Sequence, residues 1–116
     1  MKFCNSPCRD NLHAYWDDLL GTTTSSAAIA HLGDGLLQAG KPPGADVTDV
    51  AAWIKESFDL AQKDAYRAPI SADNDPSVKL SPRPNQAYQN QAESDAKARV
   101  LLAGYRLAEL LNAHLK

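Results

Sequence analysis

The final third of the chain constrains the fold more than any other part. Between Gln86 and about His114 the sequence contains no proline, and its apolar side chains recur at the three- and four-residue spacing of a single helical face. These apolar positions are Tyr88, Ala92, Ala96, Val100, Ala103, Leu107, Leu110 and Leu111. The pattern predicts the longest helix of the chain.

Three shorter segments show the same periodicity, and each is bounded by residues that start or stop helices. The first covers residues 11–20, and the second begins within the threonine and serine run at 22–26. The third extends to about residue 66 and can be capped by Asp46 or Thr48. The side chains expected to face inward are Leu12, Tyr15, Trp16, Leu19, Leu20, Ile29, Leu32, Leu36, Leu37, Val50, Trp53, Ile54, Phe58 and Ala61.

Residues 67–85 contain four prolines and no sustained apolar period, so this segment is predicted to be a loop. No segment alternates convincingly enough for a β-strand. The sequence therefore predicts an all-α fold of four helices with a proline-rich loop. A length of 116 residues suits a single domain that spans residues 1–116.

The overall charge argues against a broad polyanion-binding surface. The formal net charge is −2 at pH 7, so contacts with nucleic acid would have to be local. Residues near the amino end do not form the apolar stretch of a signal peptide, and no segment is apolar enough to span a membrane. Composition by itself does not suggest a nuclease.

The two cysteines of the chain, Cys4 and Cys8, lie in a turn-like segment. A disulfide, either between them or with another partner, is the favoured interpretation and suits an oxidising compartment. Free thiols are the next alternative. A zinc pair is the third, because such a site would need two further sulfur or imidazole ligands.

The segment Asn-Leu-His-Ala-Tyr-Trp-Asp, residues 11–17, carries the chemistry. His13 and Asp17 stand one helical turn apart, so a helix would bring the imidazole and the carboxylate within reach of one ion. These two ligand types suit zinc, and Tyr15 and Trp16 could form an apolar wall beside it. Taken alone, the pattern more often marks a hydrogen bond on a helix surface.

Several motifs together resemble the trinuclear-zinc single-strand nucleases, the nuclease S-one/P-one type. The sequence NLHAYWDDLLG at 11–21 is similar to the metal-binding helix of that family. Trp53, Glu56 and Ser57 within AAWIKES, then Tyr66, then AGYRLAELLN at 103–112 follow in the family's order. The resemblance therefore covers most of the chain from Asn11 onward.

The resemblance implies a helical fold of the phospholipase C type with three zinc ions in a cleft. It implies hydrolysis of phosphodiesters in single-stranded DNA and RNA and of the 3′-phosphates of nucleotides, by a water that two zinc ions activate. His13 and Asp17 match positions that ligate one of those ions. It also implies a secreted or periplasmic protein whose partner is single-stranded nucleic acid, with no role for a membrane.

The other ligands of the family's cluster are the mature N-terminal residue, four histidines and two aspartates. In the family's sequences all of them precede the segment to which Asn11 corresponds. We therefore expect the chain to be the C-terminal part of such a nuclease, a partial domain that is inactive alone. His31 and His114 match scaffold and are expected to face solvent or cap helices. Without the N-terminal half, apolar surface of the chain would be left uncovered. We therefore expect the chain to be marginally stable, and to associate with the missing N-terminal half or with a second copy of itself.

Two alternatives to this interpretation remain. The chain could be a helical interaction module without catalysis, or it could belong to the related zinc-dependent phospholipase C branch. The residues of the motif at 11–17 favour the nuclease family over the phospholipase C branch.

Three other polar groups have structural interpretations. Glu56 and Ser57 are expected to make a buried polar contact between helices, because no histidine stands nearby in sequence to activate the hydroxyl. Arg106 and Glu109 are expected to form an ordinary ion pair or an inter-helix contact. The basic residues of the proline-rich segment could give a modest nucleic-acid-facing edge, although a solvated loop is favoured; they are Arg67, Lys79 and Arg83.

Overall fold

The computed structural model describes residues 11–70 and 83–115. These residues form four α-helices and one π-helical turn, and no β-strand occurs among them. The elements are α1 (Leu12–Asp17), α2 (Ser26–Leu37), α3 (Val50–Leu60), η1 (Ala61–Ala65) and α4 (Gln86–His114). The predicted all-α fold with four helices is confirmed.

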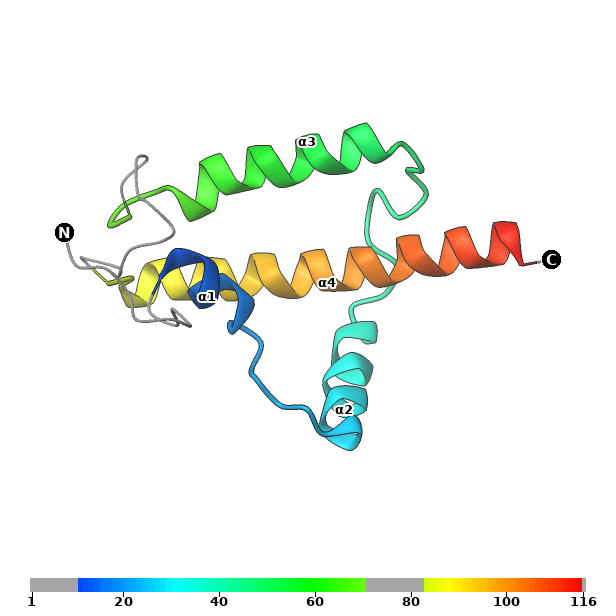
Figure 1. Cartoon of the computed structure of the whole chain (residues 1–116), viewed down its shortest axis with the longest axis horizontal. Helices are drawn as coiled ribbons and strands as arrows, with labels where there is room; N and C mark the ends of the chain where they lie inside the picture. The colour runs from blue at the N-terminus through cyan, green and yellow to red at the C-terminus, as the bar shows by residue number, and fades with distance from the viewer. Residues whose placement is uncertain (1–10, 71–82, 116) are drawn as a thin grey trace.

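Helix α4 is the axis of the molecule (Figure 1). It has 29 residues, and the side chain of Asn85 caps it by accepting a hydrogen bond from the amide of Tyr88 at 2.9 Å. At 1.5 Å per residue such a helix is about 43 Å long. The predicted limits of this helix agree with its observed limits, because a cap and an uninterrupted periodicity fix both ends locally.

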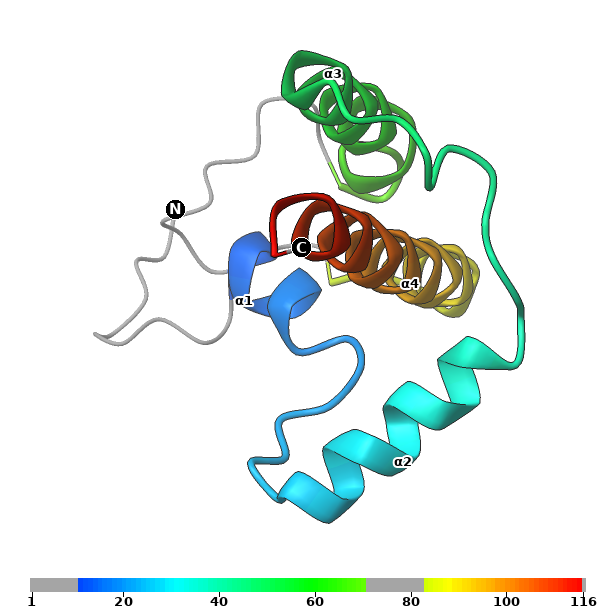
Figure 2. The same ribbon diagram turned by 90° about the vertical axis from the view of Figure 1, so that its right-hand side faces the viewer.

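The other helices are arranged around α4. Helix α3 lies beside α4 and runs in the opposite direction, while α2 lies on another side of α4, away from α3 (Figures 1 and 2). The short α1 sits against the amino-terminal part of α4. Among the described residues, no helix is long and apolar enough to cross a membrane.

The third helix differs from the prediction at both ends. Its cap is Asp49, whose side chain accepts a hydrogen bond from the amide of Ala51, whereas the expected cap Asp46 bonds to Lys41 at 2.8 Å. At its other end the α-helix does not continue to Tyr66, since η1 replaces its last turn. Periodicity cannot distinguish a π turn from one more α-helical turn.

The core is small and lies at the amino-terminal end of α4. Its buried members are Leu12, Ile70, Tyr88 and Ala92, and the partly buried side chains of Tyr15, Trp16, Leu19 and Tyr66 pack against them. The core thus joins α1, the segment after η1 and the first turns of α4. The expected inward positions of the first helix are confirmed by this cluster, except that Leu20 lies outside it.

The predicted inward faces of α2 and α3 are only partly confirmed, since Leu36, Trp53 and Ala61 are half-buried but the other predicted side chains are exposed. Neither helix contains a buried residue, and large apolar side chains remain exposed on both. They are Ile29, Leu32 and Leu37 on α2, and Val50, Ile54 and Phe58 on α3. Periodicity identifies an apolar stripe on each helix, but the described residues are too few to cover it.

The inward face of α4 also shifts along its length. Tyr88 and Ala92 are buried as predicted, but Val100, Leu107 and Leu111 are exposed, and Leu101 and Leu102 are buried in their place. Two helices flank the later part of α4 on different sides, so its contacts there do not follow one stripe.

Other predictions fall partly outside the described residues. Most of the predicted loop at 67–85 lies there, since residues 71–82 are not described, and so do Lys79 and both cysteines. The described parts of the loop are not helical. Its basic residue Arg67 bonds to the carboxylate of Asp64 at 3.4 Å.

Candidate metal centre

Helix α1 has only 6 residues and depends on tertiary contacts, because a helix this short is unstable alone. Asn11 caps it: its side-chain oxygen accepts a hydrogen bond from the amide of Ala14 at 2.7 Å. Leu12 and Ala14 are buried. Because these two side chains, with Tyr15 and Trp16, fix the inner side of α1, His13 and Asp17 are left on its outward side.

A chain of hydrogen bonds also holds α1 in place. The indole Nε1–H of Trp16 donates to the hydroxyl of Tyr88 at 3.0 Å, and that hydroxyl donates to the carbonyl of Ala65 at 2.6 Å. The two rings meet edge to face, with centroids 6.2 Å apart. Burial raises the pKa of Tyr88, so its hydroxyl stays protonated and can donate. We call this chain the Trp16–Tyr88–Ala65 relay.

His13 and Asp17 meet on the outward side of α1. The Nε2 atom of His13 lies 3.0 Å from Oδ2 of Asp17, and the two side chains are 75% and 58% exposed. They line a shallow pocket of about 280 Å³ together with Leu12, Trp16, Ala65 and Tyr66. The predicted pair is therefore brought together, with Trp16 beside it, whereas Tyr15 turns to Tyr88 in the core.

The described residues supply only these two donors. They contain no group of three or more histidine, cysteine, aspartate or glutamate side chains that could hold a metal ion. His31 and His114 are exposed on α2 and at the end of α4, as expected for residues outside the site. Imidazole and carboxylate suit zinc, but a closed zinc site has four ligands. The pair fits part of a site.

A second pocket adjoins the first and shares Asp17 and Trp16 with it. It has a volume of about 480 Å³ and lies between α1, the junction of α3 with η1, and α4. Asp95 and Arg99 of α4 and Ser57 of α3 contribute its other polar side chains. Sequence reasoning missed Asp95 and Arg99, because neither belongs to a motif and only the fold brings them beside α1.

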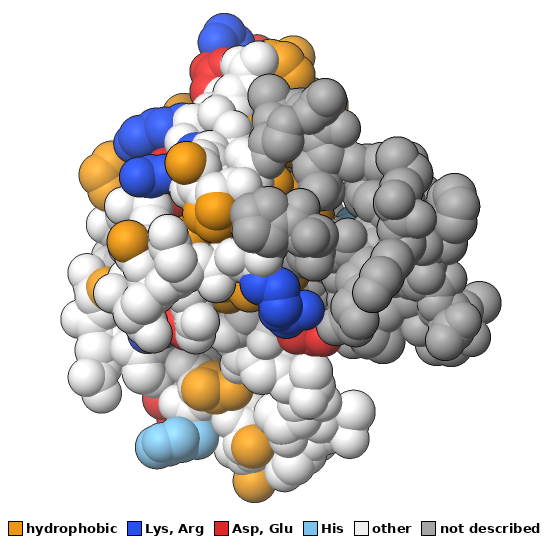
Figure 3. Space-filling view, turned by 90° about the vertical axis from the view of Figure 1, so that its left-hand side faces the viewer, with side chains coloured by type: hydrophobic (Ala, Val, Ile, Leu, Met, Phe, Trp, Pro, Cys, Tyr) orange, Lys and Arg blue, Asp and Glu red, His pale blue; other side chains and the backbone are white. Residues whose placement is uncertain are grey.

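The charges near this site are mixed. On the face of the molecule shown in Figure 3, the described lysine and arginine side chains are interspersed with acidic ones. Arg99 illustrates the pattern, since it bonds to Glu56 at 3.3 Å and to Ser57 at 3.0 Å. These contacts confirm the predicted inter-helix role of Glu56 and Ser57, but the predicted burial is wrong, since Ser57 is exposed and the Glu56 side chain is 36% exposed.

The family model described as S1/P1 Nuclease matches residues 2–116 of the chain. The chain belongs to the S1/P1 nuclease family. No curated protein and no solved structure matches it. The resemblance drawn from the motifs at 11–21, 53–57 and 103–112 is thereby confirmed.

Family membership makes the S1/P1 nuclease chain a relative of hydrolases that act on nucleic acid. The structure adds the conformation of its motifs. The first is a capped helix with an outward His13–Asp17 pair, and the others are the two sides of an inter-helix contact. In that contact Arg106, from the last motif, bonds to Glu56, from the middle one, at 2.8 and 3.0 Å. Of the two predicted alternatives, the inter-helix contact is therefore confirmed for Arg106, whereas the Arg106–Glu109 ion pair is not formed, since Glu109 lies near Lys41 instead.

Proposed function

We propose that this S1/P1 nuclease chain contributes His13 and Asp17 as two ligands of a zinc ion in a phosphodiester-cleaving site. The substrates would be single-stranded DNA or RNA and 3′-nucleotides. The observation that carries the proposal is the outward convergence of Nε2 and Oδ2, 3.0 Å apart, on a helix whose other side is fixed in the core.

The two side chains have complementary roles. Neutral imidazole offers the Nε2 lone pair, and the carboxylate offers an oxygen and a negative charge, both at the surface where an ion can reach them. The relay from Trp16 to Ala65 keeps α1 from rotating and so holds both donors at one angle. Zinc in such a site supplies positive charge to phosphate oxygens and activates water.

The complete site needs more donors than the described residues provide. We propose that the remaining ligands of a three-zinc cluster belong to another part of the family's phospholipase C-type fold, and that the chain is one partial domain of it. A secreted or periplasmic location would suit such a protein. On this basis the chain by itself should not cleave single-stranded DNA when zinc is added.

Zinc binding by the chain should be weak and should depend on His13. A full structural site is worth roughly 10–16 kcal/mol, so two ligands would supply about half, which corresponds to a dissociation constant between about 0.2 mM and 1 μM. We expect His13→Ala to abolish this binding in a calorimetric or NMR zinc titration. His31→Ala is the matched control, because His31 is an exposed histidine on α2.

Equal zinc affinity in wild type and His13→Ala would contradict the ligand assignment. Chelator-sensitive cleavage of single-stranded DNA by the chain alone would contradict the view that its site is incomplete. The complete parental nuclease, in contrast, should cleave single-stranded substrate and lose that activity with either His13→Ala or Asp17→Asn.

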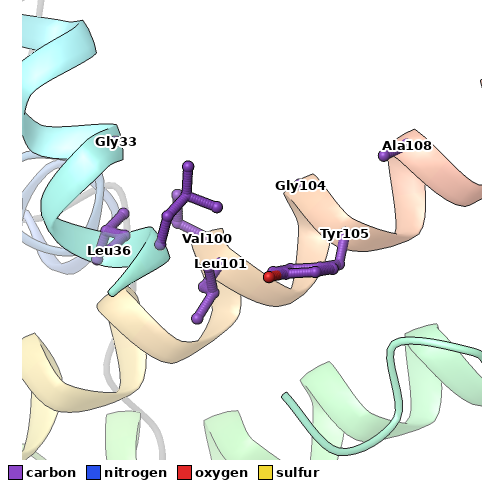
Figure 4. A pocket seen from close by; sticks show the side chains of 8 residues that line it. Gly33, Leu36, Val100, Leu101, Gly104, Tyr105 and Ala108 are labelled. Carbon is purple, nitrogen blue, oxygen red and sulfur yellow. The ribbon is translucent and has the colours of Figure 1, made fainter. Parts of the chain in front are cut away.

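A second candidate function is an interaction surface, favoured by the apolar groove between α2 and α4. The groove has a volume of about 390 Å³ and is lined by Gly33, Leu36, Leu37, Val100, Leu101, Gly104, Tyr105 and Ala108 (Figure 4). The same two helices carry further exposed apolar side chains, including Leu32 and Leu107. We propose that another part of the nuclease fold covers this groove.

Left uncovered, the groove should make the chain self-associate. We expect sedimentation velocity to show an apparent mass that increases with protein concentration. Val100→Asp should reduce this increase, because it places a negative charge in the lining of the apolar groove. Ile54→Asp on α3 is the matched control, since Ile54 is also exposed but does not line the groove. A monomer at all concentrations would contradict the proposal.

A further inference from the structure

Two aspartates that no motif predicted meet between η1 and α4. Asp64, on η1, is 1% exposed and is one of the two largest fully buried side chains. Asp95, on α4, is partly buried, and its carboxyl group lies near enough to that of Asp64 for a hydrogen bond to join the two when one of them is protonated. A buried carboxylate is costly unless it is paired, so two of them in contact require an explanation.

The hydrogen bonds of the two carboxyl groups are incomplete in the same way. Arg67 donates to Oδ1 of Asp64 at 3.4 Å, and Gln91 donates to Oδ1 of Asp95 at 3.0 Å. The Oδ2 atom of each aspartate is buried and receives no N–H or O–H donor from the described residues. A single proton would satisfy both atoms, because a carboxyl O–H on one residue can donate to the carboxylate of the other.

The charges around the pair support one proton rather than none. Arg67 balances one negative charge, and Lys63 of η1 is exposed and acts more weakly on Asp95 than burial and Asp64 do. Asp17 of α1 and Arg99 of α4 line the pocket that Asp95 also lines, but Arg99 is engaged by Glu56. The second negative charge therefore has no cation of its own among the described residues.

We propose that Asp64 and Asp95 share one proton, and that its loss loosens the contact between η1 and α4 that supports helix α1. The link to α1 is short. Ala65 follows Asp64 directly, and its carbonyl is the end of the relay that passes through Tyr88 to Trp16. A shift of η1 away from α4 would lengthen the bond between Tyr88 and Ala65 first.

The direction of the pH effect follows from the environment. Burial, and next the bond to Asp64, raise the pKa of Asp95 from 3.8 to about 6. Since this pKa is higher in the folded chain than in the unfolded one, the stabilisation is complete below about pH 4 and is lost as pH rises through 6. If His13 and Asp17 hold zinc, as proposed above, the same proton controls how stably the helix that carries them, α1, packs against α4.

The test follows the pair and the relay separately by NMR, without metal. It uses a His13→Ala background, so that titration of that imidazole cannot contribute. The NMR signal of the Asp95 side-chain carbon should titrate with a midpoint near pH 6, which corresponds to proton binding about 100-fold tighter than in a free aspartate. Asp64→Asn should move this midpoint toward the ordinary value of about 4. The indole N–H of Trp16 should shift with the same midpoint, and Asp95→Asn should remove that step.

Two controls are built into the chain. The indole of Trp53 donates to Val47 far from the pair and should show no step near pH 6. Asp59→Asn changes an exposed aspartate that bonds to Lys55, and it should leave the Trp16 step unchanged. Ordinary titration of Asp95 near pH 4 would overturn the shared proton. A Trp16 step that persists in Asp95→Asn would overturn the link to α1. Neither result depends on zinc binding.

Discussion

Replacing Arg106 with methionine is expected to reduce the free energy of unfolding by about 3 kcal/mol, the largest effect of any single change considered for this chain. The side chain is 6% exposed and makes a two-pronged contact with the carboxylate of Glu56, at 2.8 and 3.0 Å. It also donates to the carbonyl of Gly44 at 3.2 and 3.0 Å. Methionine would keep part of the packing and lose all of these bonds.

The position of Arg106 explains why the loss should be large. Its guanidinium lies 5.2 Å from the centroid of the Trp53 ring, so it joins α3, α4 and the segment before α3 at one point. Gly44 has a φ of +86°, and a Cβ there would come within 3.3 Å of Arg106, so the glycine permits this approach. Without the arginine, the carbonyl of Gly44 and the carboxylate of Glu56 would lose buried partners.

Urea denaturation followed by circular dichroism measures this effect. Arg99→Met is the matched control, because Arg99 also bonds to Glu56 but its side chain is 30% exposed and water can replace its contact. We expect the control to lose about 1 kcal/mol or less. Equal losses in the two variants would mean that burial of Arg106 does not matter. The guanidinium of Arg106 also holds the pKa of Glu56 below its ordinary value, and the shift should diminish in Arg106→Met.

Removing the hydroxyl of Tyr88 is expected to destabilise the chain by about 2 kcal/mol. The ring in Tyr88→Phe would still fill its place in the core, where Tyr88 is 2% exposed. The carbonyl of Ala65 and the indole N–H of Trp16 would both lose their partner. Because those groups lie on η1 and α1, the loss should also expose the Trp16 indole to solvent. A red shift of the Trp16 fluorescence emission would report this exposure.

Tyr15→Phe is the control for Tyr88→Phe. Tyr15 belongs to the same cluster, with its ring centroid 5.9 Å from that of Tyr88, but its buried hydroxyl has no hydrogen-bond partner within residues 11–70 and 83–115. Removing it should leave the stability unchanged or slightly increased, because an unpaired polar atom leaves the core. A Tyr88→Phe variant as stable as Tyr15→Phe would show that the relay does not hold α1.

Some features of this fold are determined by residues close together in the sequence, and others by contacts between distant segments. The limits of α4 and the convergence of His13 with Asp17 follow from caps and from helical periodicity, which act within a few residues. The shift from α-helix to η1 at Ala61 does not, because it depends on how Asp64 is accommodated against α4. The same holds for the Arg106–Glu56 contact, whose partners are 50 residues apart.

Burial was the least predictable property, for a physical reason. A helical stripe indicates which side chains would gain from being covered, but it does not say what covers them. Phe58 is 58% exposed and Val100 51% exposed in positions that their stripes predict to be inward. Leu12 and Tyr88 are buried as predicted, because α1 and the first turns of α4 cover each other within the described residues.

The weak attachment of α2 affects what a denaturation experiment on this chain can report. The helix contains no buried residue and touches the rest through the edge of an open groove, whereas α1, η1 and α4 share a core. Local opening of α2 therefore costs little compared with global unfolding. The backbone amides of α2 should exchange with deuterated solvent long before those of α4. One free energy then describes the cooperative unit around α4, and a separate, smaller one describes α2.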